Sequence, residues 1–255
     1  MKLRALLLIA MVSMLAACAS VPKGQLSPLA SYRASPNQSL RKPSIIVLHY
    51  TVEDTLEGSR KILSDARRKH PVSSHYLIDR DGRILQLVPD HLRAWHAGDG
   101  RWAGMRDLND TSIGIEIVNT GSEPFPEPQV QAVIALLADL TTRHAIPKTQ
   151  LIGHADLAPG RKIDPGVQFP WKRVFDAGFG IWPGELVDPP EGFDGWKALR
   201  LIGYPLDNPR ATLHSFRLRF RGIDDGDRGT AKGVDVAALP ELQPEDLRIL
   251  HALGQ

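Results

Sequence analysis

The sequence is poor in cysteine, and its charges nearly cancel. Its 255 residues include one cysteine, Cys18, which excludes an internal disulfide and a cysteine-rich metal cluster. The 31 lysine and arginine residues against 29 aspartate and glutamate residues leave a net charge of +2, which offers no basic field for nucleic acid. With 42% hydrophobic and 24% charged residues, the composition also excludes disordered, collagen-like and multi-span membrane proteins. Any metal site must therefore use histidine, aspartate and glutamate, and nine histidines are present.

The first residues have the pattern of an export signal, with two basic residues, an apolar run and then small residues. Leu15–Cys18 resembles the lipobox of bacterial lipoproteins, in which the cysteine becomes the lipidated first residue. We therefore expect a lipoprotein signal peptide over residues 1–17 and a lipid anchor at Cys18. Because Ala19 is not the aspartate of an inner-membrane retention signal, we expect an outer-membrane lipoprotein facing the periplasm. The alternative is an uncleaved membrane anchor, since the uncharged run over residues 5–21 can just span a bilayer.

Strand and helix patterns alternate in the next part of the chain. Ser-, Pro- and Gln-rich residues first predict a flexible tether over 18–43. Apolar β-branched runs and an Asp-Gly turn predict strands, and apolar residues at helical spacing predict helices. The strands are expected over 44–50, 74–78, 84–88, 111–118 and 151–154, and the helices over 57–69 and 128–144. This mixture favours an α/β (α+β) fold with a central mixed β-sheet flanked by helices.

The pattern breaks near Asp188, where two prolines and a glycine predict a linker. Beyond the break, three short segments around Leu199, Phe216 and Leu250 carry apolar residues at helical spacing. We therefore expect a larger domain over 44–186 and a small C-terminal three-helix domain over 190–255.

Three residues could form a metal site. A catalytic zinc site needs about three nitrogen or oxygen ligands and an open position for water. His49, His154 and Asp164 supply such a set without any thiolate. Spacing alone does not select them, because a single histidine is more often a surface residue or a hydrogen-bonded core residue.

Glu116 lies inside an apolar strand pattern. Strand alternation places Ile113, Ile115 and Ile117 on one face and Glu116 on the other. A carboxylate in such a strand is costly to bury unless it is paired, near a metal or shifted in pKa. Glu116 is therefore either a tuned general base or one half of a buried ion pair.

Five ordered motifs resemble one enzyme family. They are His49–Thr51, Ser73–Ile78, Ala94–Gly98, Asn109–Glu116, and His154–Gly166 with Phe169–Trp171. Over about Ser44 to Pro183 the chain resembles the type 2 zinc-dependent N-acetylmuramoyl-L-alanine amidases. The resemblance implies that 44–186 is the catalytic domain and that His49, His154 and Asp164 hold one Zn²⁺. It also implies that Glu116 is the catalytic acid/base and that Lys162 stabilises the oxyanion.

The same resemblance implies a substrate groove lined by His75, His96 and Trp95. The alternatives are a structural role for the two histidines and a core or rim position for the tryptophan. The expected enzyme cleaves the amide bond between the lactyl group of N-acetylmuramic acid, or its anhydro form, and L-alanine of the stem peptide in peptidoglycan fragments. We expect it to be a monomer. Residues 190–255 resemble a peptidoglycan-binding helical domain, and a structural cap is the alternative.

Three other functions are alternatives to this amidase activity. A peptidoglycan-recognition protein that binds without cleaving is expected to lack a zinc ligand, and this chain retains all three. A cytoplasmic anhydromuropeptide amidase has similar motifs, but the signal peptide and the C-terminal segment argue against it. A zinc peptidase is not supported, because no His-Glu-x-x-His sequence is present.

Overall fold

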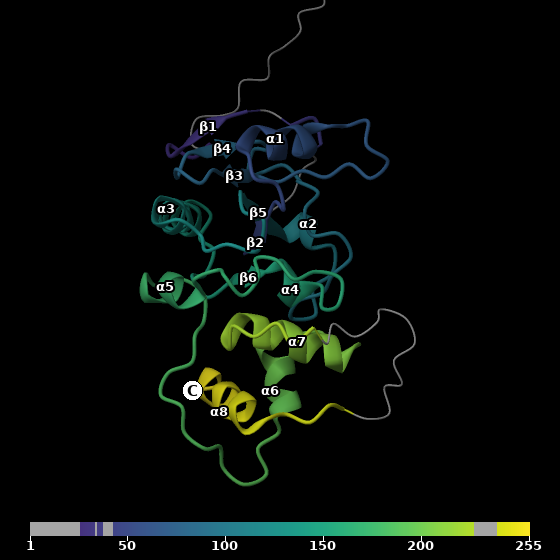
Figure 1. The fold of residues 1–255 in the computed structure, drawn as a ribbon, viewed down its shortest axis with the longest axis vertical. Coiled ribbons are helices and arrows are strands. Elements are labelled where there is room, and N and C mark those ends of the chain that lie inside the picture. Colours follow the sequence, from purple (N-terminus) through teal and green to yellow (C-terminus); the bar gives the residue numbers. More distant parts are fainter. Residues whose placement is uncertain (1–25, 34, 38–42, 227–238) are drawn as a thin grey trace, which may run out of the picture.

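The computed structural model describes residues 26–33, 35–37, 43–226 and 239–255. The predicted signal peptide, Cys18 and part of the predicted tether lie outside the described residues. Figure 1 shows a sheet whose strands follow one another down the molecule, with three helices beyond its last strand.

Six strands in the described residues form one mixed sheet. They are β1 (Ala30–Tyr32), β2 (Ile45–Tyr50), β3 (Tyr76–Ile78), β4 (Ile84–Gln86), β5 (Ser112–Ile117) and β6 (Leu151–Gly153), in the order β1-β4-β3-β5-β2-β6. The β3–β4 pair is antiparallel and is joined by the predicted Asp-Gly turn, whereas the other pairs are parallel. The predicted fold class is confirmed.

The helices of the larger domain lie on both sides of the sheet, with α3 and α5 on one side and α1, α2 and α4 on the other (Figure 1). Their bounds are α1 (Leu56–Ser64), α2 (Leu108–Thr111), α3 (Glu127–Arg143), α4 (His154–Leu157) and α5 (Trp171–Asp176). The sheet face that packs against α3 is apolar and includes Ile46, Leu48 and the three isoleucines of β5. Strand alternation sends Val47 and His49 to the opposite face.

The three predicted C-terminal helices are present as α6 (Gly195–Ile202), α7 (Pro209–Phe220) and α8 (Pro244–Leu253). Helix α7 lies between α4 and the α6–α8 pair (Figure 1). One buried apolar cluster joins Val47 and Ile152 of the sheet with Leu199, Phe216 and Ile249 of these helices. The helices therefore share a core with the sheet, and burial of this shared surface stabilises both parts. No helix in the described residues has both the length and the hydropathy that a bilayer span requires.

The structure differs from the sequence-based expectations at several places. Within the predicted tether, Ala30–Tyr32 form strand β1, which covers the edge of β4 and satisfies its backbone groups. Helix α1 ends at Ser64 instead of Lys69, because the Asp65 side chain accepts a hydrogen bond from the Arg67 amide and favours a turn. The short helices α2, α4 and α5 were not predicted, since four to six residues are too few to show a helical period.

Candidate metal and catalytic site

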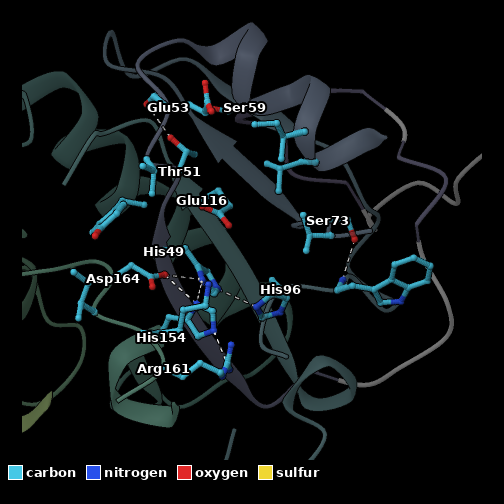
Figure 2. Close-up of a pocket in the computed structure, with 18 of the residues that line it drawn as sticks. His49, Thr51, Glu53, Ser59, Ser73, His96, Glu116, His154, Arg161 and Asp164 are labelled. Atoms are coloured by element: carbon cyan, nitrogen blue, oxygen red, sulfur yellow. Dashed lines mark hydrogen bonds and ion pairs between the residues drawn. The ribbon is translucent and has the colours of Figure 1, made fainter. Parts of the chain in front are cut away.

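Strand pairing places His49 beside Glu116. The two residues are register partners at the carboxyl ends of the parallel strands β2 and β5. Register partners on neighbouring strands direct their side chains to the same face of the sheet. That face is the one away from α3, so both side chains enter the space above the sheet edge (Figure 2).

His154 and Asp164 reach the same point from the other side of β2. Strand β6 runs parallel to β2 and ends at Gly153, so His154 is the first residue of α4. The Ala155 amide donates a hydrogen bond of 2.9 Å to the backbone oxygen of Asp164, which holds the following loop against the helix. His154 was expected near a strand end, and the structure adds the short helix that carries it.

Three donor atoms converge at the centre of the site (Figure 2). His49 Nδ1 lies 2.9 Å from His154 Nδ1 and 3.1 Å from Asp164 Oδ2, and His154 Nδ1 lies 3.0 Å from the same oxygen. All three residues are buried. Two imidazoles and a carboxylate are the ligands of catalytic zinc sites that contain no thiolate.

The surrounding hydrogen bonds determine which ring nitrogens carry hydrogen. His154 Nε2 lies 3.0 Å from the Ala97 carbonyl oxygen, which can only accept, so in a neutral ring Nε2 carries the hydrogen and Nδ1 presents a lone pair. The Ser112 hydroxyl donates to the Leu108 carbonyl, so it accepts from His96 Nε2 at 3.2 Å. In a neutral His96 ring, Nδ1 then accepts from His49 Nε2 at 3.0 Å.

These bonds leave lone pairs of both Nδ1 atoms directed at each other and at a carboxylate oxygen. Burial and the neighbouring His154 lower the pKa of His49 to about 4, so this ring is neutral at pH 7. Burial alone would raise the pKa of Asp164, but His154 and His49 outweigh it and hold this pKa below its usual range. Neutral imidazoles and an ionised carboxylate are the protonation states that a divalent cation requires, so the donor set fits a metal ion.

Glu116 lines the same cavity as this donor set. Its Oε2 atom is buried and has no hydrogen-bond partner among the described residues. Burial, followed by the charge of Asp164, raises the pKa of Glu116 well above its usual value, and Lys162 opposes the shift. Glu116 is therefore a stronger base than an ordinary glutamate, and it does not form the buried ion pair that the sequence left open.

A cavity of about 360 Å³ joins these groups. Its lining includes six predicted site residues beyond Glu116: His49, Trp95, His96, His154, Lys162 and Asp164. The lining also contains the apolar residues Ile62, Leu63 and Val72. The structure therefore brings a metal-type donor set, a half-buried acid and a mixed polar and apolar surface into one space.

His75 is not part of the cavity lining. It is fully buried, its Nδ1 accepts from the Gly114 amide at 3.0 Å, and its Nε2 donates to the Leu92 carbonyl at 3.0 Å. Both ring nitrogens thus hold backbone groups, which is the structural role considered as an alternative. The prediction that His75 lines the groove does not agree with this placement. Trp102 is also buried, in the apolar cluster with the C-terminal helices.

Three supporting residues were not singled out from the sequence. Asn109 Oδ1 accepts from the amides of His96 and Ala97, which fixes the loop that carries His96. Ser112 continues the hydrogen bonds from His96, and Arg161 donates to the Ala97 carbonyl at 2.7 Å. All three lie inside the motifs, but their partners are far away in sequence, so no local pattern indicates these roles.

The fold and the site define a class: an α/β protein with a His-His-Asp metal-type donor set beside a half-buried glutamate. The N-acetylmuramoyl-L-alanine amidase family model (Amidase_2) matches residues 39–167, and the chain belongs to this family. The predicted resemblance is confirmed.

Two curated relatives illustrate the match. The chain is 42% identical over 155 residues to the N-acetylmuramoyl-L-alanine amidase AmiD of Escherichia coli, covering 54% of each chain. It is 44% identical over 102 residues to the 1,6-anhydro-N-acetylmuramyl-L-alanine amidase AmpD of Citrobacter freundii, covering 40% of this chain and 54% of that protein. The chain thus spans about half the length of the curated relatives it matches.

Solved structures extend the similarity. The complex of E. coli AmiD with anhydro-N-acetylmuramic acid-L-Ala-D-γ-Glu-L-Lys aligns with a TM-score of 0.68 and 33% identity, covering 84% of this chain and 90% of that one. AmpDh3 of Pseudomonas aeruginosa in complex with an anhydromuramic pentapeptide aligns with a TM-score of 0.67 and 32% identity, covering 90% and 97%. These neighbours share the mixed sheet with its flanking helices.

Proposed function

We propose that this protein is a zinc-dependent N-acetylmuramoyl-L-alanine amidase of cell-wall turnover or recycling. It cleaves the amide bond between the lactyl group of N-acetylmuramic acid, or its anhydro form, and L-alanine of the stem peptide in peptidoglycan fragments. The observation that carries this proposal is the convergence of three donor atoms of His49, His154 and Asp164 beside Glu116, whose Oε2 atom is buried. The AmiD and AmpDh3 complexes with anhydromuropeptides support the substrate class.

In this proposal, His49 and His154 hold one Zn²⁺ through Nδ1, and Asp164 holds it through Oδ2. A bound Zn²⁺ supplies a Lewis acid for the scissile carbonyl and lowers the pKa of a water molecule toward about 7. The residues around it supply the remaining chemistry. Their outer hydrogen bonds, from His49 to His96 and from His154 to the Ala97 carbonyl, keep both rings oriented for this task.

Glu116 moves the protons in this mechanism. Its carboxylate accepts a proton from the attacking water and passes it to the leaving nitrogen of L-alanine, as its raised pKa favours. Lys162 lines the same cavity, where its positive charge stabilises the developing oxyanion. Trp95 and His96 lie along the cavity and contact the sugar or the peptide.

Product analysis of defined muropeptides by mass spectrometry tests the proposal. Glu116→Ala should keep its zinc and lose about 10²- to 10⁴-fold in turnover, because a positioned acid/base contributes that much. His154→Ala should lose the metal. His144→Ala is the control, since His144 is a hydrogen-bonded histidine outside the cavity lining. Full activity of Glu116→Ala, or unchanged zinc in His154→Ala, would contradict the assignment, and retention of muropeptides without cleavage would favour a recognition protein.

We also propose the cellular arrangement predicted from the sequence. Residues 1–17 are a signal peptide, Cys18 carries the lipid, the residues between Cys18 and strand β1 link the anchor to the catalytic domain, and the monomer faces the periplasm from the outer membrane. Palmitate labelling of wild type and Cys18→Ser, followed by membrane fractionation, tests the anchor. An equal label on both chains would contradict it.

For residues 190–255 we retain the proposal of a peptidoglycan-binding domain. Binding of the full-length Glu116→Ala chain to insoluble sacculi, with and without exposed substitutions on α8, tests this role. Binding that no α8 substitution changes would favour a structural cap.

A further inference from the structure

The helix that presents His154 depends on a buried carboxylate. Asp156 lies in α4, two residues after His154, and is fully buried. Its Oδ2 accepts a hydrogen bond of 2.8 Å from the amide of Gly153, the residue before the helix. Asp156 therefore caps the first turn of a helix that is only four residues long and has little stability of its own.

The C-terminal helices supply the other partners of this carboxylate. Arg219 of α7 donates from Nη1 to Asp156 Oδ2 at 2.8 Å, and the Tyr204 hydroxyl, just after α6, donates to Asp156 Oδ1 at 2.5 Å. Arg219 and Tyr204 are themselves buried. A buried carboxylate that lost these donors would keep only one backbone partner, a costly arrangement that favours its displacement.

Further contacts hold the guanidinium group of Arg219 in place. Its Nη2 donates to the Leu151 carbonyl of β6 at 3.1 Å, and the group lies 4.3 Å from the ring centre of Trp171. Tyr204 packs against Trp102, with ring centres 5.0 Å apart. These contacts hold both side chains in place. Through their hydrogen bonds to Asp156, the position of the C-terminal helices therefore determines the position of α4.

Displacement of α4 would move two of the three donor residues, His154 and Asp164. His154 begins the helix, and the next amide, that of Ala155, holds the backbone oxygen of Asp164 at 2.9 Å. Because ligand atoms must lie within a few tenths of an ångström of the correct geometry, a small shift of this helix weakens metal binding.

We infer that Arg219 and Tyr204 are positioning residues for the metal site, which act by fixing Asp156 and through it the helix that presents His154. The three C-terminal helices are then a structural component of the site. This inference rests on the proposed function, since it takes His154 to hold zinc.

The test measures zinc affinity by competition with a chromophoric chelator. Arg219→Met keeps the length of the side chain and removes the charge, and Tyr204→Phe removes one oxygen atom. Arg219→Met should weaken zinc binding by about 10- to 100-fold, as loss of outer partners does in other metal sites, and Tyr204→Phe by about tenfold. Saturating zinc should restore turnover in both variants. At sub-saturating Co²⁺, the absorption spectrum of the bound metal should differ from that of the wild type.

Arg217→Met is the matched control. Arg217 lies on the same helix and pairs with buried Asp246, but its ion pairs stay within the C-terminal region. This variant should lose thermal stability and keep its zinc affinity within about twofold, because sites that share no partner are independent.

The outcomes separate the two proposals. Zinc affinities of Arg219→Met and Tyr204→Phe within about twofold of wild type would overturn the positioning role, and an equal loss in Arg217→Met would assign the effect to general destabilisation. If Arg219→Met does not fold, Tyr204→Phe decides. If the wild-type chain binds no zinc, both the proposed function and this inference are overturned. If the wild type binds zinc and cleaves muropeptides, and both variants bind zinc as tightly as the wild type, only the inference is overturned.

Discussion

The hydrogen bond between His49 and His96 provides a sharp test of how the site is held. His49 Nε2 donates to His96 Nδ1 at 3.0 Å, and His96 is buried with its own Nε2 bonded to Ser112. His96→Ala removes the acceptor and leaves a buried donor on His49 unsatisfied. The backbone of residue 96 should stay in place, since its amide donates to the Asn109 side chain at 2.9 Å.

Two estimates of the effect agree. A buried donor that loses its partner costs about 1–3 kcal/mol. Loss of an outer partner of a metal ligand lowers metal affinity by about 10- to 100-fold, which corresponds to about 1.4–2.7 kcal/mol. We therefore expect His96→Ala to bind zinc about 10- to 100-fold more weakly, measured by competition with a chromophoric chelator.

Two further variants make the result specific. His96→Asn places an acceptor oxygen near the position of the lost Nδ1 atom, so it should recover part of the affinity. His144→Ala removes a histidine bonded to Asp90, outside the cavity lining, and should leave zinc affinity unchanged. If His96 acts only on substrate, His96→Ala would raise KM and keep the wild-type zinc affinity, and that result would refute the reasoning.

Three other changes probe the strand, the acid and the core. Gly114→Ala places a Cβ atom 2.4 Å from the His96 ring, so it should weaken zinc binding and cost about 1–3 kcal/mol in urea unfolding; no change in either value would contradict this packing. Burial raises the folded-state pKa of Glu116 above its usual 4.5, so the protonated carboxyl stabilises the metal-free protein at low pH and this contribution disappears as the pH rises through the folded pKa. Glu116→Gln should therefore raise the Tm of the metal-free protein at pH 8 and have little effect at pH 4, and a difference that is independent of pH would speak against the shift. Arg143→Met removes the guanidinium group that pairs with buried Asp90, which should cost about 3 kcal/mol in urea unfolding while zinc affinity stays the same; a loss below about 1 kcal/mol would count against the pair.

Local periodicity predicted the parts of the site that depend on one strand. The alternation through β5 placed Glu116 opposite the three isoleucines, and the structure has those isoleucines in the apolar cluster and Glu116 at the cavity. Strand alternation is a property of neighbouring residues and needs no knowledge of the rest of the chain. The same reasoning identified the three C-terminal helices.

Convergence of His49, His154 and Asp164 could not be predicted from spacing. It depends on the parallel pairing of β2 with β6, which brings together residues more than a hundred positions apart, and on the contact of the Asp164 backbone with α4. Only the resemblance to a family indicated this set. The strand β1 was missed for a related reason, because its three residues show no pattern and form a strand only against the exposed edge of β4.

His75 and His96, the two histidines next to β5, show that residue type alone does not predict the role of a side chain. Both were expected to line a groove, and both contact Gly114, yet their roles diverge. His75 lies directly before β3, so its backbone and its Nδ1 are both engaged by the Gly114 main chain, and its Nε2 is directed to the Leu92 carbonyl. His96 comes from a loop outside the sheet, and its ring occupies the space that a Cβ atom at position 114 would fill. The missing side chain of one glycine thus admits His96 to hydrogen-bond distance of His49, while strand pairing directs His75 away. Residue type alone cannot distinguish these two outcomes, because His75 is bonded to the main chain of Gly114 whereas His96 packs where the side chain of Gly114 would be.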